Sequence, residues 1–185
     1  MLLSVSVMHA EETLKYITPE AFQEGLRANT IAPNTFYWGN TKDDRTLLPT
    51  PQVDGGIPYI GIQGGEAPRV DRASLSSFLY RIIPIPRGKA KTVTLSFETK
   101  FEENLWSEAR RNINPALDAP SVSVFFSDGK RVCADIPFVY NTAYNSWILD
   151  TKTFEIPKDA KYIGFSMASP GGTYAKIRNI NIAFE

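Results

Sequence analysis

The chain has 185 residues, of which 43% are hydrophobic and 22% are charged, so it can build a folded core and is not a disordered tail. Twenty Lys and Arg residues balance twenty Asp and Glu residues, which leaves no positive surplus of the kind that nucleic-acid-binding proteins carry. The single histidine is His9 and the single cysteine is Cys133. These counts exclude an internal disulfide, a cysteine-rich metal site and, in the body of the chain, any catalytic relay that needs an imidazole.

The first ten residues resemble the end of a secretory signal. Residues 2–10 are apolar or small, Ala10 stands at the expected cleavage point, and Glu11 and Glu12 follow. The alternative is an apolar edge strand. From this resemblance we expect export, to the bacterial envelope or beyond it. No stretch reaches the ~20 apolar residues of a transmembrane helix, so the exported product is expected to be soluble.

Residues 11–33 are expected to form an N-terminal segment with one short helix, ahead of a β-domain at 34–185. Thr18 fits a helix N-cap and Pro19 fits the first helical position. Gly25 is expected to limit the length of this helix.

The β-domain opens with the aromatic run Phe36, Tyr37 and Trp38, which alternates at strand spacing. At least one of the three rings therefore faces outward, and the core is the better placement for Trp38. Residues 41–56 are rich in charges, proline and glycine and are predicted to be a loop.

The second half alternates apolar and polar residues more regularly. Val93, Leu95 and Phe97 share one face of a strand, and Asp128-Gly129 predicts a hairpin turn. Ile177 and Ile180 have opposite parity in the last strand, which predicts a bulge near Arg178 or Asn179. Further strands are predicted at 57–63, 77–85, 122–126, 131–136, 147–156 and 161–167.

Eight or nine strands with almost no helix predict an all-β, antiparallel two-sheet sandwich. The stretches "IIPIPRGKAKTVTLSFETKF", "SVSVFFSDGKRV", "SWILDTKTFEIPKDAKYIGFSM" and "GGTYAKIRNINIAFE" occur in an order that resembles the galactose-binding-like jelly-roll modules, especially carbohydrate-binding modules. The resemblance covers about residues 34–185. It implies a jelly roll that binds a glycan through aromatics on one sheet face or in edge loops, and it allows a structural calcium ion.

The best candidate sugar site is the stretch "PFVYNTAYNSW". Sugars need flat apolar faces beside hydrogen-bonding groups, and Tyr140 and Tyr144 are interleaved with Asn141 and Asn145. The two tyrosines fit a site or an exposed turn equally well. Trp147 is expected to open a strand and to pack into the sandwich edge.

Trp106 is a second candidate, in the irregular segment 102–119. It fits either the anchor of a short helical lid or an exposed stacking contact. Long segments of this kind in compact domains are often functional.

Catalytic signatures are missing. Glu102 and Glu103 are adjacent in sequence, which does not place two carboxyl groups across a glycosidic bond. The sequence therefore favours a non-catalytic carbohydrate-binding module. The alternatives are a structural or protein-interaction sandwich of the bacterial envelope and a carboxylate-dependent glycan-active enzyme. The expected partner is a glycan, and the resemblance allows the domain to be part of a larger enzyme or surface assembly.

Overall fold

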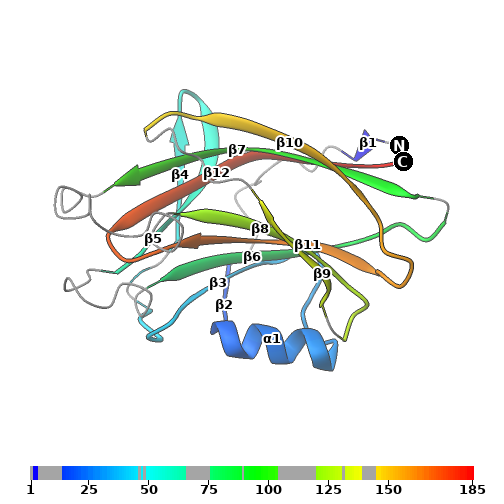
Figure 1. The fold of residues 1–185 in the computed structure, drawn as a ribbon. Coiled ribbons are helices and arrows are strands. Elements are labelled where there is room, and N and C mark those ends of the chain that lie inside the picture. Colours follow the sequence, from blue (N-terminus) through cyan, green and yellow to red (C-terminus); the bar gives the residue numbers. More distant parts are fainter. Residues whose placement is uncertain are drawn as a thin grey trace.

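The computed structural model describes residues 2–3, 14–45, 47, 49–65, 76–88, 90–103, 120–130, 132–138 and 145–185. They form two stacked six-stranded sheets, with one helix beneath the lower sheet (Figure 1). Sheet A contains, in order, β10 (Ile148–Glu155), β7 (Thr92–Glu103), β12 (Thr173–Phe184), β5 (Ile57–Gln63) and β4 (Thr50–Asp54), and β1 (Leu2–Leu3) also pairs with β12. Sheet B contains, in order, β2 (Lys15–Tyr16), β3 (Phe36–Asn40), β6 (Ser77–Pro84), β11 (Tyr162–Ser169), β8 (Ser121–Ser127) and β9 (Val132–Phe138).

All strand pairs are antiparallel except the two-residue pairing of β2 with β3, so the predicted all-β sandwich is confirmed. The strands outnumber the eight or nine predicted from the sequence. The additional strands are β1 and β2, which are very short, and β4, which lies in the segment 41–56 that was predicted to be a loop. The loop prediction is wrong for Thr50–Asp54. Pro51 is tolerated there because β4 is an edge strand, where a missing N–H need not interrupt a hydrogen-bond ladder.

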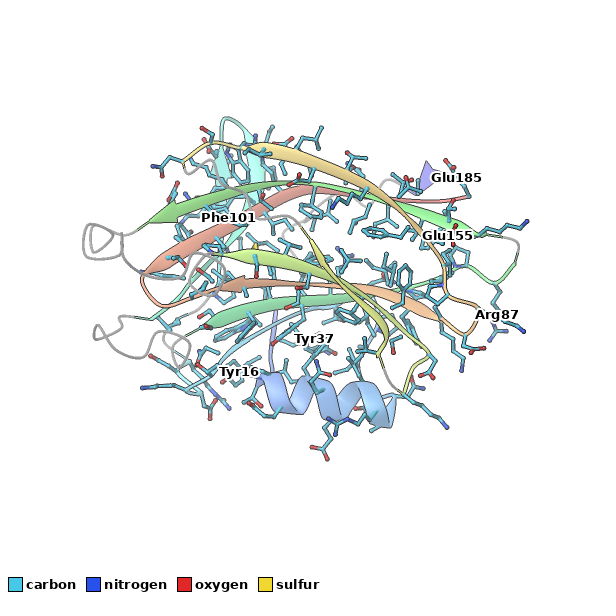
Figure 2. All side chains as sticks on the ribbon, in the orientation of Figure 1. Tyr16, Tyr37, Arg87, Phe101, Glu155 and Glu185 are labelled. Atoms are coloured by element: carbon cyan, nitrogen blue, oxygen red, sulfur yellow. The ribbon has the colours of Figure 1, made fainter. Side chains whose placement is uncertain are left out.

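The core lies between the two sheets, as Figure 2 shows for the labelled Phe101. The predicted inward face of β7 is confirmed, because Val93, Leu95 and Phe97 are each at most 1% exposed. Trp38 is buried in the same core, also as predicted. Tyr37 points the other way, toward the helix (Figure 2), and is buried there rather than exposed.

The predicted bulge in β12 is confirmed. The pairing of β12 with β7 shifts its register between Arg178 and Asn181, and Asn179 adopts a φ of 51°. Ile177 and Ile180 are both buried as a result. An extra residue therefore keeps both apolar side chains in the core.

The helix α1 (Pro19–Ala28) covers the outer face of sheet B (Figure 1). The predicted N-cap is confirmed, because Thr18 Oγ1 accepts a hydrogen bond from the Ala21 N–H at 3.2 Å. The expectation that Gly25 limits the helix is wrong, since the helix runs on to a left-handed Asn29. A Cβ on Gly25 would lie 2.6 Å from Ile31 Cδ1, so the glycine allows close packing.

The hairpin turn at Asp128-Gly129 joins β8 to β9, as predicted, with Gly129 at a φ of 91°.

At the N-terminus, Leu2–Leu3 pair with Ile182 and Ala183 of β12. The cleavage after Ala10 and the division of the chain at residues 10 and 33 stay predictions. Among the described residues, no helix has the length and apolar character needed to cross a bilayer.

Replacing Phe97 with alanine should lower the free energy of unfolding by about 3–5 kcal/mol, because the change leaves a cavity among close-packed side chains. Chemical denaturation measures this loss. Ser96→Ala, on the opposite face of β7, is the matched control and should change stability by less than about 0.5 kcal/mol. A loss below about 1 kcal/mol for Phe97→Ala would contradict the inward placement.

Candidate functional site

The outer face of sheet A carries a continuous group of aromatic and charged side chains, which we call the platform. Its side chains come from alternate positions of β7, β12 and β5, from the end of β4 and from the residue before β10. Alternate residues of a strand point away from the core, so neighbouring strands bring these side chains together. The platform consists of Asp54, Tyr59, Glu98, Lys100, Glu102, Trp147, Tyr174, Lys176 and Arg178.

Trp147 is the aromatic centre of the platform. Its Nε1–H donates a 2.7 Å hydrogen bond to Asp54 Oδ2, and the Tyr59 ring meets it edge-on at 5.6 Å between ring centroids. The Arg178 guanidinium lies 3.9 Å from the ring centroid, within cation–π range. Trp147 directly precedes β10 and is half-buried on the outer face of sheet A, not inside the sandwich.

Arg178 is held in place by the bulge of β12. Its Nε donates to Glu98 Oε2 at 2.6 Å, and its Nη1 donates to the Asp54 carbonyl at 3.2 Å. Asn179 Nδ2 donates to the other carboxylate oxygen of Glu98 at 2.8 Å. Burial raises the pKa of Glu98, but the hydrogen bonds from Asn179 and Arg178 outweigh it and hold the pKa below its ordinary value.

A second ion pair lies further along the same strands. Lys176 Nζ donates to Glu102 Oε1 at 2.7 Å, and Lys100 Nζ lies 3.4 Å from the same oxygen. The Lys176 ammonium also lies 4.7 Å from the centroid of the Tyr174 ring and 5.3 Å from that of Tyr59. The lysine is only 8% exposed, so its charge is fixed by one carboxylate and two aromatic faces.

Tyr174 packs directly over the backbone of Gly61. A Cβ at Gly61 would lie 2.2 Å from the Tyr174 hydroxyl, so this position of β5 has no room for a side chain. Burial and the neighbouring Tyr59 hydroxyl raise the pKa of Tyr174 to about 12. The tyrosine therefore stays a neutral hydrogen-bonding group at physiological pH.

The charges of the platform balance. Its cations are Lys100, Lys176 and Arg178, and its anions are Asp54, Glu98 and Glu102. The hydrogen bond from Trp147 is the main cause that holds the pKa of Asp54 below its ordinary value. Paired charges of this kind offer hydrogen-bond donors and acceptors side by side without a net charge.

The predicted loop residues Trp106, Tyr140, Asn141 and Tyr144 lie outside the described residues. Asn145 is described: it is exposed, has a φ of 65°, and its N–H donates to the Phe101 carbonyl at 2.8 Å. This bond ties the end of the predicted loop to β7, two residues before Trp147. The predicted stretch therefore leads directly into the platform.

None of the charged platform residues was predicted from the sequence to belong to a site. The signal was present, since Glu98 and Lys100 alternate with buried residues along β7, as do Lys176 and Arg178 along β12. What was missing was the pairing of β7 with β12, which places Lys100 opposite Lys176 and Glu98 opposite Arg178. Among the described residues, no three His, Cys, Asp or Glu side chains gather closely enough to hold a metal ion.

The chain matches no known family and no curated protein, whereas solved structures with the same fold are found. A candidate sugar-binding protein from Bacteroides thetaiotaomicron VPI-5482 superposes with a TM-score of 0.57 at 12% identity, over 95% of this chain and 96% of that one. The enzymatically active domain of tailspike protein 4 from bacteriophage CBA120 gives 0.50 at 14% identity, over 82% of this chain but only 18% of that one. TmCBM61, solved with β-1,4-galactotriose, gives 0.48 at 13% identity, over 88% of this chain and 97% of that one.

The fold is therefore the jelly-roll sandwich that the sequence resemblance implies. The first two likenesses establish the fold alone, because their sequence identities are low. What the chain binds must be argued from its own side chains.

Replacing Trp147 with phenylalanine should raise the pKa of Asp54 toward its ordinary value of 3.8, because the ring remains while the Nε1–H donor is lost. A lowered carboxyl pKa stabilises the fold above the unfolded-state pKa, and this contribution disappears as the pH falls through the folded-state pKa. The stability difference between the two proteins should therefore shrink below pH 3.8.

A carbon-detected NMR titration of the Asp54 carboxyl group measures this shift. Tyr59→Phe is the matched control, because it removes a hydroxyl that bonds to Gln52 and leaves the indole in place. An unchanged Asp54 pKa in Trp147→Phe would contradict the assigned role of the indole N–H.

Proposed function

We propose that the chain is a non-catalytic carbohydrate-binding module whose platform contacts a neutral glycan. The observation that carries the proposal is Trp147, a half-buried flat ring set among charge-paired hydrogen-bonding groups on one sheet face. A pyranose offers a C–H face for such a ring and hydroxyls for the groups around it.

The arrangement of Trp147 limits how a sugar stacks on it. The Arg178 guanidinium occupies one face of the indole, and the Tyr59 ring contacts it edge-on. The opposite face of the indole is therefore the surface that we assign to the sugar. Lys100 and Glu102, with side chains 20% and 27% exposed, are the partners we assign to its hydroxyls.

The balanced charge favours a neutral glycan over an anionic one. An anionic sugar would gain from the three cations of the platform but would meet the carboxylates of Asp54, Glu98 and Glu102 at close range. A neutral sugar meets no such repulsion and uses both kinds of group.

We further propose that the adjoining loop extends the site through Tyr140, Tyr144, Asn141 and Asn145, with Trp106 as an additional stacking residue.

Asp54 and Glu98 of the platform are poor general acids. The pKa values of Asp54 and Glu98 are held below their ordinary values, whereas a glycosidase acid needs a raised pKa. Among the described residues, Asp150 is the carboxyl group whose pKa is raised, by burial. It is therefore the side chain to replace if turnover is ever observed.

We also propose export to the bacterial envelope or beyond, as part of a larger enzyme or surface assembly.

Trp147→Ala should raise the Kd for a bound neutral oligosaccharide at least tenfold, equivalent to about 1.4 kcal/mol, because the stacking surface is removed. Isothermal titration with the best ligand from a glycan array measures the change. Val53→Ala is the matched control. Val53 is 66% exposed but points away from the platform, because its neighbours in β4 point to the opposite face.

Tyr144→Ala tests the loop and should weaken binding with little change in the melting temperature.

Failure of the array to yield any ligand would favour the structural or protein-interaction alternative. Binding that is equal in the wild type and in Trp147→Ala would move the site away from the platform. Release of reducing ends from a polysaccharide panel, abolished by Asp150→Asn, would instead establish the enzyme alternative.

A further inference from the structure

A small pocket lies between the helix α1 and the outer face of sheet B, on the opposite side of the sandwich from the platform. It has a volume of about 240 Å³, and Gln23, Phe78, Tyr80, Ser123 and Ser166 contribute to its lining. Helix and sheet together therefore build a concave site from elements that the platform does not use. We call it the helix-side pocket.

Hydroxyl groups lie in one row across the pocket. Ser166 of β11 is the register partner both of Ser123 in β8 and of Tyr80 in β6. The two serines are half-buried. Within the part of the chain that the structure describes, neither serine hydroxyl nor the Gln23 amide has a hydrogen-bond partner, so all three are available to a ligand.

The aromatic wall of the pocket is a stack of three rings. Tyr80 stacks with Phe22 of the helix and with Phe78, with centroid distances of 4.3 and 5.8 Å and interplanar angles of 13° and 12°. Tyr80 is itself buried, whereas Phe78 is half-buried and so offers exposed ring surface to a ligand.

Among the described residues, no Lys, Arg, Asp or Glu side chain lines the pocket. Burial raises the pKa of Tyr80 well above its ordinary value, so this hydroxyl also stays neutral. A charged ligand would find no counter-charge among these described lining residues. A purely apolar ligand would bury two serine hydroxyls without partners, which is unfavourable.

We propose that the helix-side pocket is a second binding site, which takes a single neutral sugar ring. The C–H face of the sugar packs on Phe78, and its hydroxyls bond to Ser123, Ser166 and Gln23. The proposal is independent of the platform, because the two sites lie on opposite faces and share no residue.

The test is a titration of the ¹⁵N-labelled chain with methyl glycosides of galactose, glucose and mannose, followed by amide NMR shifts. At least one glycoside should shift the amide signals of Ser123 and Ser166. Its Kd should rise at least tenfold in the double variant Ser123→Ala/Ser166→Ala, and also in Phe78→Ala. Trp147→Ala and Ser96→Ala, both on sheet A, are the controls and should leave this Kd unchanged.

Three results would overturn the proposal. The first is that none of the glycosides shifts these amides. The second is that the shifts disappear in Trp147→Ala, which would assign the sugar to the platform alone. The third is that indole binds the pocket with equal affinity in the wild type and in the serine double variant while the glycosides do not, which would make it an apolar site. If Phe78→Ala does not fold by circular dichroism, the serine variant alone decides.

Discussion

The bulge in β12 is the constraint on which both the core and the platform depend. β12 lies between β7 and β5 in the middle of sheet A, so its register fixes its neighbours. The extra residue keeps Ile177 and Ile180 in the core, and it brings the side chains of Arg178 and Asn179 to the same carboxylate of Glu98. In a regular strand, consecutive side chains point to opposite faces.

The two outer faces of the sandwich differ because one is covered by a helix and the other is not covered by any described helix (Figure 1). On sheet B, α1 buries Phe22 and Leu26 against aromatic side chains, which makes that face apolar. On sheet A, the alternate residues that point outward carry charged side chains, and these pair with each other across neighbouring strands. There Trp147 is contacted by Asp54 and by Arg178, which is itself paired with Glu98. Contacts of this kind order a side chain before any ligand binds.

Much of the fold was predictable from the sequence, because the strand periodicity, the Asp128-Gly129 turn and the parity change before Ile180 are local signals. β4 was missed because Pro51 and the nearby glycines indicate a loop, and only its place at the sheet edge makes the strand acceptable. Gly25 was misjudged for a related reason, since its contact with Ile31 depends on packing. The platform could not be predicted, because its two hydrogen-bonded ion pairs, Lys176–Glu102 and Arg178–Glu98, join residues that are 74 and 80 positions apart.

The most direct test of the central claim is the NMR signal of the Trp147 indole N–H during titration with a neutral oligosaccharide. Its hydrogen bond to Asp54 and its contact with Arg178 fix the environment of this proton in the free protein. If the platform binds the glycan, the indole signal shifts in proportion to the bound fraction, together with the amides of β7 and β12. An indole signal that stays in place at saturating glycan would contradict binding at the platform.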